Sequence, residues 1–275
     1  MATRRKFLRN LGAGAALSLP AVGAPAGASE GQQMPGSPPA GGVQGNERSS
    51  IMAIAAHPGD GFFAMGLPVA LQVHHGGPGV FLSLSLGEKG SPTVPPSQYG
   101  AIQREASERA ARVLGAKAAF LTYPDGEVPE SDEAALAVCD LIREYKPAIL
   151  VTHWRGSWHK DHRACYRVVN DAIFFAALPA ITRKAPAHAV QKLYLAENWE
   201  DAEGFAPDTY LDVSPIFGRW SEACALFPMW RGETGFRYND YYRSLAVARG
   251  AVSGFTDAVA LMSAPQQLVR HVRGL

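Results

Sequence analysis

Cysteine, a surplus of one charge and long apolar runs are all scarce in this sequence of 275 residues. Lys and Arg number 26 against 25 Asp and Glu, so no basic surplus indicates nucleic acid as a partner. Three cysteines are too few for a disulfide framework or a cysteine-rich zinc site, and each is expected to be a small buried apolar residue. Hydrophobic residues make up 47% of the chain, which is typical of a globular protein.

Several catalytic and binding motifs are also missing. The glycine-rich stretches match neither a dinucleotide-binding fingerprint nor a phosphate-binding loop. No Gly-x-Ser-x-Gly elbow occurs, so nothing supports a serine or cysteine hydrolase. After the first 28 residues, no stretch approaches 18 consecutive apolar residues, and we predict no membrane span there.

The first 28 residues have the order of an export signal. A basic start containing Arg4 and Arg5 precedes a weakly apolar stretch over 11–22 and the small-residue pattern Ala26-Gly27-Ala28. The arginine pair resembles the twin-arginine signal, whose machinery carries folded proteins across the bacterial inner membrane. We therefore expect an exported protein, periplasmic or extracellular. The alternative is a basic N-terminus on a cytoplasmic protein.

Two further regions follow this segment. Residues 29–50 are rich in Gly, Pro, Gln and Ser and are expected to form a flexible linker, because they hold too few large apolar residues to bury. Residues 51–275 are expected to form a single catalytic domain in which strands and helices alternate. That alternation predicts a three-layer, Rossmann-like α/β fold with a mostly parallel sheet. Strands are expected at 51–56, 80–86, 118–122, 148–152, 192–196 and 210–213, and helices at about 62–73, 99–114, 131–145, 162–177, 215–227 and 240–251.

Polar residues follow several of the predicted strands. In folds of this class ligands bind beyond the carboxyl ends of the strands, so these residues are expected on one rim of the sheet. His57 and Asp60 follow the first strand, and His159, Asp161 and His162 follow the fourth. Two imidazoles and one carboxylate that converge on a cation are typical of a catalytic zinc site. The alternative is a set of unrelated polar loop residues.

These residues also carry a resemblance to a known family. The segment Ala56-His57-Pro58-Gly59-Asp60 resembles the Ala-His-Pro-Asp-Asp-Glu motif of the PIG-L/LmbE-like zinc-dependent N-deacetylases. The segment from His159 to Ala164 resembles the family's His-Pro-Asp-His-Arg-Ala signature. Six further segments fall in the family's order, so that the resemblance covers about residues 51–260. They are Leu86–Gly90, Arg104 with Glu108, Leu114-Gly115, Pro124–Gly126, Asp212–Ser214 and Arg249-Gly250.

The resemblance implies a metal site and its chemistry. His57, Asp60 and His162 would bind Zn²⁺ or another divalent ion, which polarises the carbonyl of an acetamide and acidifies water. His159 would stabilise the oxyanion, and Asp161 would orient His159 through a hydrogen bond.

The resemblance also implies the substrate, which would be an N-acetylated amino sugar or a conjugate of one. Arg104 and Asp125 match positions that the resemblance implies hold the sugar hydroxyls or the group attached to the sugar. The alternative for Arg104 is an arginine on the solvent-facing side of a helix, and the alternative for Asp125 is an ordinary aspartate in a turn. Trp154 and Trp158 could stack on a sugar face, although core packing is the usual role of Trp, and His153 could line the pocket.

The sequence departs from the family pattern at the general base. Gly59 stands where the family motif has its first Asp, and Gly61 stands where the motif has Glu. General base catalysis contributes about 10²- to 10⁴-fold in rate, so its loss should impair hydrolysis severely. Glu88 and Asp161 are the candidate replacements for the missing base. Two other functions stay open: a non-catalytic module that binds metal and sugar, or a different metal-dependent hydrolase on the same scaffold.

Overall fold

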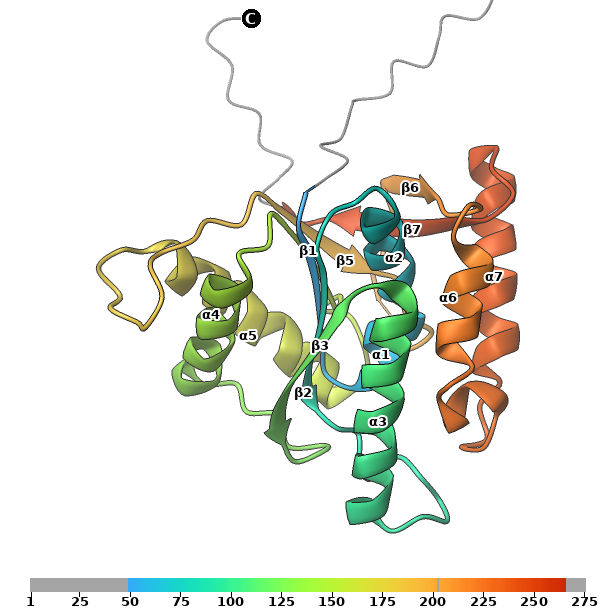
Figure 1. Cartoon of the computed structure of the whole chain (residues 1–275), viewed down its shortest axis with the longest axis horizontal. Coiled ribbons are helices and arrows are strands. Elements are labelled where there is room, and N and C mark those ends of the chain that lie inside the picture. The colour runs from blue at the N-terminus through green and yellow to red at the C-terminus, as the bar shows by residue number, and fades with distance from the viewer. Residues whose placement is uncertain (1–48, 202, 266–275) are drawn as a thin grey trace, which may run out of the picture. The chain divides into compact units, whose positions relative to one another are not determined.

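A computed structural model describes residues 49–201 and 203–265, and its strands form one sheet (Figure 1). The strand order is β3-β2-β1-β4-β5-β7-β6. Strands β1 to β5 pair in parallel, while β7 is antiparallel to both β5 and β6. The mostly parallel sheet is confirmed. The strands are β1 (Ile51–Ala55), β2 (Gly79–Ser85), β3 (Lys117–Tyr123), β4 (Ile149–Thr152), β5 (Lys192–Ala196), β6 (Thr209–Asp212) and β7 (Ala258–Ser263).

Helices cover both faces of this sheet, which gives the predicted three layers. In Figure 1, α4 and α5 lie on one side of the sheet, and α1, α2, α3, α6 and α7 lie on the other. The helices are α1 (Pro58–Phe63), α2 (Gly66–His74), α3 (Pro96–Leu114), α4 (Asp132–Tyr145), α5 (Lys160–Ala177), α6 (Phe217–Cys224) and α7 (Tyr238–Ser253), with the 3₁₀ turn η2 (Pro228–Arg231) before α7.

Strand β1 shows why the sheet is covered on both faces. All five of its residues are buried, and alternate side chains point to opposite faces. Ile51, Ala53 and Ala55 pack in the core beneath α1, α2, α3 and α6, whereas Met52 and Ile54 pack in the core beneath α4 and α5. A continuous apolar run is therefore the expected pattern for this strand.

Helix ends follow the predicted capping residues. The Ser131 hydroxyl accepts a hydrogen bond from the Ala134 amide at 3.3 Å and begins α4. Gly115 ends α3 with a φ of 74°, a conformation that favours glycine. One prediction was wrong: the single helix expected at 62–73 is two helices. Pro68 lies in the first turn of α2, where its missing amide hydrogen breaks no helical hydrogen bond.

Strand β7 was not predicted. It lies between β5 and β6 and pairs with both in antiparallel fashion. Ala258, Ala260, Leu261 and Met262 are buried. The run contains no alternation of polar and apolar residues that would have identified it as a strand.

All described residues belong to one compact unit of the chain. The predicted export signal over 1–28 and nearly all of the predicted linker lie outside the described residues, as do residues 266–275. Among the helices that the structure describes, none combines the length and the apolar character needed to span a bilayer.

Candidate active site

The parallel strands bring polar residues to one rim of the sheet. His57 follows β1, Asp125 follows β3, and His162 lies in the first turn of α5 after β4. Gly87, directly after β2, has a φ of 63°, and a Cβ there would lie 3.4 Å from the Cβ of His57. This turn can therefore pass close to His57 only because glycine adopts the conformation without strain.

Asp60 lies between two imidazoles. Its Oδ2 atom is 3.0 Å from His57 Nδ1 and 3.0 Å from His162 Nε2. Its other oxygen, Oδ1, accepts a hydrogen bond from Asn198 Nδ2 at 3.1 Å. The Tyr242 hydroxyl donates to Asn198 Oδ1 at 3.1 Å and so orients this amide. The Asp60 carboxylate is thus positioned by His57 directly before α1, by His162 of α5, and by Asn198 after β5, which Tyr242 of α7 orients.

The second nitrogen of His57 faces two more carboxylates. Its Nε2 atom lies 3.2 Å from Asp125 Oδ1 and 3.2 Å from Asp161 Oδ2. Asp161 is completely buried and accepts hydrogen bonds from the backbone amides of Gly126 at 2.7 Å and Val128 at 3.3 Å. These contacts orient the His57 ring, as carboxylates commonly do for histidines that bind metals.

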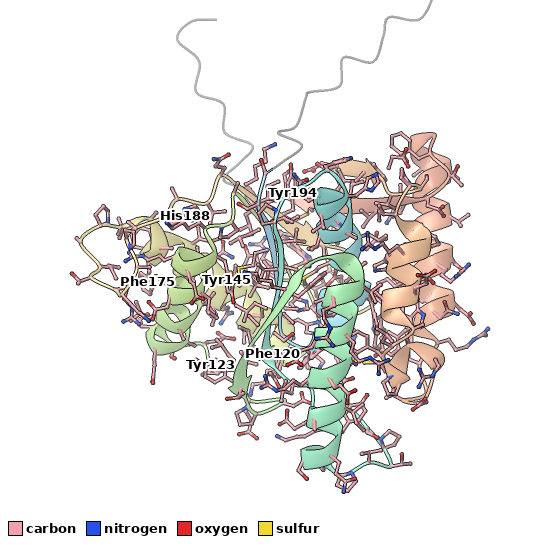
Figure 2. All side chains as sticks on the ribbon, viewed as in Figure 1. Phe120, Tyr123, Tyr145, Phe175, His188 and Tyr194 are labelled. Carbon is pink, nitrogen blue, oxygen red and sulfur yellow. The ribbon has the colours of Figure 1, made fainter. Side chains whose placement is uncertain are left out.

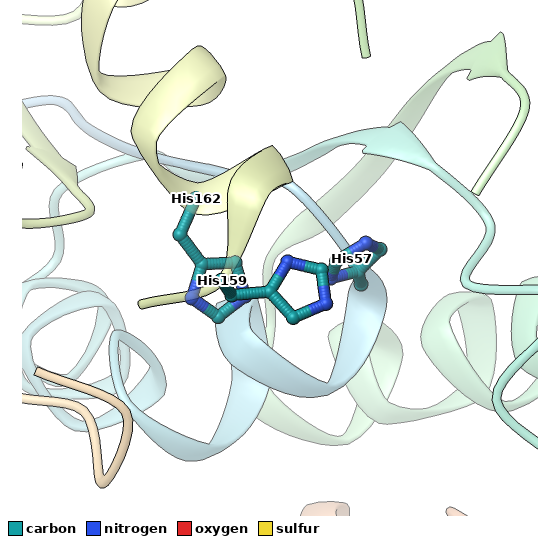
Figure 3. Close-up of side chains that lie close together, drawn as sticks. All are labelled: His57, His159 and His162. Atoms are coloured by element: carbon teal, nitrogen blue, oxygen red, sulfur yellow. The ribbon is translucent and has the colours of Figure 1, made fainter. Parts of the chain in front are cut away.

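His159 stacks on His162, with 4.5 Å between ring centroids (Figure 3). It caps the N-terminus of α5, because its Nδ1 accepts a hydrogen bond from the Asp161 backbone amide at 3.2 Å. A neutral His159 ring therefore carries its proton on Nε2. The sequence predicted that the Asp161 carboxylate orients His159. That carboxylate instead lies against His57, and the backbone amide of Asp161 contacts His159.

The outer nitrogen of His162 is held by residues that were not predicted. Nδ1 lies 3.0 Å from Glu200 Oε2 and 3.1 Å from the Ser157 hydroxyl. His153 stacks on the same ring at 4.0 Å, and its Nε2 accepts a hydrogen bond from the Ala56 amide at 3.0 Å. His153 is almost completely buried beneath the cluster.

Burial and close charges shift the ionisation of this cluster. Burial alone would lower the pKa of His57, but hydrogen bonds to Asp125, Asp161 and Asp60 outweigh it and raise the pKa well above its usual value. Burial opposes ionisation of Asp60, yet the charge of His162 holds the Asp60 pKa well below its usual range. The carboxylates of the cluster therefore favour a positive charge between them.

The pKa values of Glu200 and His159 shift so as to favour the neutral form of each side chain. Burial, followed by the charge of Asp60, raises the pKa of Glu200 to about 8. Burial and the neighbouring imidazoles of His162 and His57 lower the pKa of His159 to about 4. His159 is thus neutral near pH 7 and can donate a hydrogen bond from Nε2.

The donor set fits a divalent metal ion. Imidazole nitrogens and carboxylate oxygens are suitable ligands for zinc and for other divalent ions. The predicted ligands His57, Asp60 and His162 meet at Asp60 Oδ2. Three overlapping groups have ligand atoms within 4.8 Å of one another: His57, His159 and His162; Asp60, His153 and His162; and His57, Asp125 and Asp161.

The cluster lies in a pocket of about 290 Å³. Of the described residues that line it, none is Lys or Arg. Arg104 is not among them: its guanidinium lies 4.4 Å from the ring centre of Phe120, which Figure 2 labels on β3. The lining residues are His57, Gly59, Asp60, Gly87, Gly90, Tyr99, Gln103, Asp125, His159, His162, Trp199, Glu200, Met229, Thr234, Phe236 and Tyr238.

The two tryptophans singled out in the sequence do not line this pocket. Trp154 is buried in a small cluster with Leu195 and Met262, and Trp158 is 57% exposed. Trp199 lines the pocket instead, in a segment without periodic pattern after β5. Tyr99 and Gln103 were also missed, although they extend the buried face of α3 at helical spacing.

Removing Glu200 should weaken metal binding. We expect Glu200→Ala to lower the affinity for Zn²⁺ by about 10- to 100-fold, because His162 loses the carboxyl group that orients its outer nitrogen. Competition with a chelator of known affinity measures this change. The matched control is Glu203→Ala, an exposed Glu on the same loop. Equal affinities in the two variants would show that Glu200 does not support the metal site.

Comparison with known proteins shows which families and enzymes this chain resembles. Residues 52–173 match the model of the PIG-L family, described as GlcNAc-PI de-N-acetylase. The chain is 21% identical over 212 residues to the 4-oxalmesaconate hydratase of Pseudomonas putida, covering 74% of this chain and 80% of the relative. It is 28% identical over 184 residues to 1D-myo-inositol 2-acetamido-2-deoxy-alpha-D-glucopyranoside deacetylase 2 of Catenulispora acidiphila, covering 54% of this chain and 60% of the relative.

The fold is that of a solved sugar deacetylase. The N,N'-diacetylchitobiose deacetylase of Pyrococcus horikoshii superimposes with a TM-score of 0.67 at 20% identity, covering 82% of this chain and 87% of the other. His57, Asp60 and His162 all fall within the segment that matches the family. Residues 52–173, which carry the candidate metal ligands, therefore match the PIG-L family of de-N-acetylases.

Proposed function

We propose that this chain is a metal-dependent N-deacetylase of the PIG-L family, which hydrolyses the acetyl amide of an uncharged N-acetylated amino sugar or conjugate. One observation carries the proposal: the candidate ligands His57, Asp60 and His162 lie in a pocket whose described lining contains no Lys or Arg. Such a lining suits a neutral amide. The family match and the similarity to a sugar deacetylase support the same reaction class.

The chemistry divides between the ion and the protein. A divalent ion would polarise the amide carbonyl and make water more acidic. His57, Asp60 and His162 would hold that ion. His159 would donate from Nε2 to the oxygen that gains charge, because its Nδ1 is occupied by the Asp161 amide. A donor placed at this oxygen stabilises the transition state more than the substrate.

The missing general base is the weak point of such an enzyme. A Cβ added at Gly59 would lie 3.0 Å from Sδ and 3.1 Å from Cε of Met229. The Met229 thioether therefore occupies the space into which an Asp side chain would extend. Without a carboxylate at this position, we expect hydrolysis to be slow.

The substitutes considered from the sequence do not line the pocket. Asp161 is completely buried behind His57, and Glu88 accepts hydrogen bonds from the Asp125 amide at 2.9 Å and the Ser85 hydroxyl at 3.3 Å. Besides Asp60, the carboxylates that do line the pocket are Asp125 and Glu200. Each of them contacts a candidate ligand.

Hydration of an unsaturated acid is the second candidate function. The similarity to a relative named 4-oxalmesaconate hydratase covers 74% of this chain, more than the similarity to the deacetylase covers. Gly59 also favours a reaction other than amide hydrolysis. The residues that line the pocket argue against a hydratase, because a carboxylate substrate would lie beside the carboxylates of Asp60 and Asp125 and no described Lys or Arg.

The two functions can be tested on one preparation. We expect the Zn²⁺-loaded protein to release free amine slowly from methyl N-acetyl-β-D-glucosaminide, to lose this activity with EDTA, and to regain it when Zn²⁺ is restored. The same protein is then given 4-oxalmesaconate, and loss of the alkene absorbance is followed. Loss of absorbance without amine release would identify a hydratase. If the protein binds metal but catalyses neither reaction, two functions remain: the non-catalytic binding module, or another metal-dependent hydrolase.

We also propose that the protein is exported from the cytoplasm. The arginine pair Arg4 and Arg5 supports transport by the twin-arginine machinery to the periplasm or beyond. Fractionation of cells that express the chain, with both arginines intact or changed to Lys, tests this directly. Retention of both proteins in the cytoplasm would contradict it.

A further inference from the structure

Three polar side chains of the pocket have buried atoms without a hydrogen-bond partner. Across the described residues, such atoms are Tyr99 Oη, Gln103 Oε1, Thr234 Oγ1 and Asp201 Oδ1. The first three belong to residues that line the pocket. Tyr99 is 3% exposed and Gln103 is 2% exposed. Buried polar atoms are normally paired, so three unpaired ones in one pocket indicate a group that a ligand satisfies.

These side chains are placed together by the fold. Tyr99 and Gln103 are four residues apart on α3 and therefore share one face of the helix. Thr234 comes from the short segment between η2 and α7, and Met229 lies in η2. The three polar residues and Met229 line the same pocket as Gly59 and Asp60, so a ligand held by them would extend to the candidate metal site.

The orientation of Gln103 indicates which atoms the ligand presents. Its Nε2 donates to Met229 Sδ at 3.5 Å, which leaves Oε1 as the free atom of the amide. A thioether can only accept, so the amide NH₂ must face the sulfur. Oε1 can then only accept a hydrogen bond. The matching ligand atom is a donor, such as a hydroxyl or an N–H.

The surroundings disfavour an anion and favour a ring. A carboxylate or a fully ionised phosphate has no hydrogen to donate to Gln103 Oε1, and it would approach Asp60 and Asp125 without a described Lys or Arg in the lining. Trp199 and Phe236 also line the pocket and stack on each other at 4.3 Å with 19° between their planes. Flat apolar side chains of this kind contact the apolar face of a ring, while their neighbours bind its polar edge.

We propose that Tyr99, Gln103 and Thr234 form a subsite for the hydroxyl groups of an uncharged, polyhydroxylated ring. The substrate would then be a neutral glycoside rather than a phosphorylated or carboxylated conjugate. The assignment of a deacetylation substrate rests on the proposed function. Binding of the ring does not require turnover, so the two can be tested separately.

Calorimetric titration of the Zn²⁺-loaded full chain with methyl N-acetyl-β-D-glucosaminide tests the subsite. Tyr99→Phe and Thr234→Val each remove one hydroxyl at nearly constant shape. We expect each to weaken binding about threefold to tenfold, the usual effect of one neutral hydrogen bond. N-acetylglucosamine 6-phosphate should bind at least about tenfold more weakly than its uncharged parent, because close like charges raise the free energy of binding.

Control variants separate the subsite from general damage. Tyr145→Phe changes a tyrosine at the end of α4, on the opposite face of the sheet (Figure 2), and should leave binding unchanged. Both proteins are also titrated with a panel of monodeoxy glycosides, each of which lacks one hydroxyl. The glycoside that lacks the hydroxyl bound by Tyr99 should bind Tyr99→Phe and the natural protein equally well. Melting temperatures of both subsite variants should stay level or rise.

Each result either supports or overturns the subsite. Hydroxyl-dependent ring binding without amine release would support it while contradicting the proposed deacetylation. Amine release with unchanged binding in both variants would overturn it and leave the proposed function standing. Tighter binding of the phosphorylated sugar, or no ring binding at all, would also overturn it. A fall in melting temperature of about 2–4 °C with unchanged ring binding would assign these hydroxyls to the fold instead.

Discussion

The double variant Gly59→Asp with Met229→Ala is expected to release amine from N-acetylglucosaminides about 10²- to 10⁴-fold faster than the natural chain. The Asp restores a carboxylate beside the candidate metal ligands, and the smaller residue at 229 removes the thioether that lies 3.0 Å from the new Cβ. Gly59 is not among the glycines with positive φ, so the backbone accepts a side chain there. Initial rates of amine release at saturating Zn²⁺ measure the gain.

Three comparisons identify the source of any gain. Gly59→Asp alone should gain less, because the Met229 side chain must move before the carboxylate fits. Met229→Ala alone should gain little, since it adds space without a base. Gly59→Asn with Met229→Ala has nearly the shape of the active pair but cannot take up a proton. An equal rise in this Asn variant would show that pocket volume, not proton transfer, limits the natural chain.

Arg143→Met is expected to lower the free energy of unfolding by about 3–5 kcal/mol. Arg143 is 2% exposed, and its guanidinium donates to five backbone carbonyls at 2.9 to 3.2 Å. Met fills much of the same volume but removes all five of these hydrogen bonds, and only the carbonyls of Phe175, Ala176 and Leu178 keep a backbone donor. Urea unfolding followed by circular dichroism measures the loss. The carbonyls belong to Phe175, Ala176, Leu178, Ile181 and Ala185 at the end of α5 and the loop beyond it.

An exposed arginine provides the control for this experiment. Arg167 on α5 pairs with Glu130 at the surface, where its side chain is 65% exposed. Arg167→Met should change the stability by less than about 1 kcal/mol, since exposed ion pairs contribute little. A loss for Arg143→Met as small as that for Arg167→Met would mean that the carbonyls around residue 143 find other donors or water.

The sequence predicted the sheet and its rim because strong local patterns specify both. Apolar runs that alternate with amphipathic helices leave few arrangements other than a parallel sheet covered on both faces. Once the strands are parallel, the residues after β1, β3 and β4 must meet, and His57, Asp125 and His162 do line one pocket. Ser131 begins α4 and Gly115 ends α3, both as predicted, because caps depend on local chemistry alone.

The remaining parts of the site depend on tertiary contacts that no local pattern encodes. Glu200 and Asn198 lie in an irregular segment after β5, where Glu200 contacts His162 and Asn198 contacts Asp60. Both contacts join residues that are far apart in the sequence. On α3, the choice between neighbouring residues depends on the rotation of the helix. Gln103 faces the pocket, whereas Arg104 lies over Phe120, so the match of Arg104 to a sugar-binding position stays a prediction.

The hydrogen-bonded series from Tyr242 through Asn198 to Asp60 has a consequence for biosynthesis. Asp60 emerges early from the ribosome, but the tyrosine that orients its partner lies in α7, near the end of the chain. Until α7 has been made and docked, a nascent protein therefore lacks the hydrogen bond that orients Asn198 toward the candidate ligand Asp60. Tight metal uptake would thus follow the completion of synthesis, and metal content would distinguish finished molecules from incomplete ones.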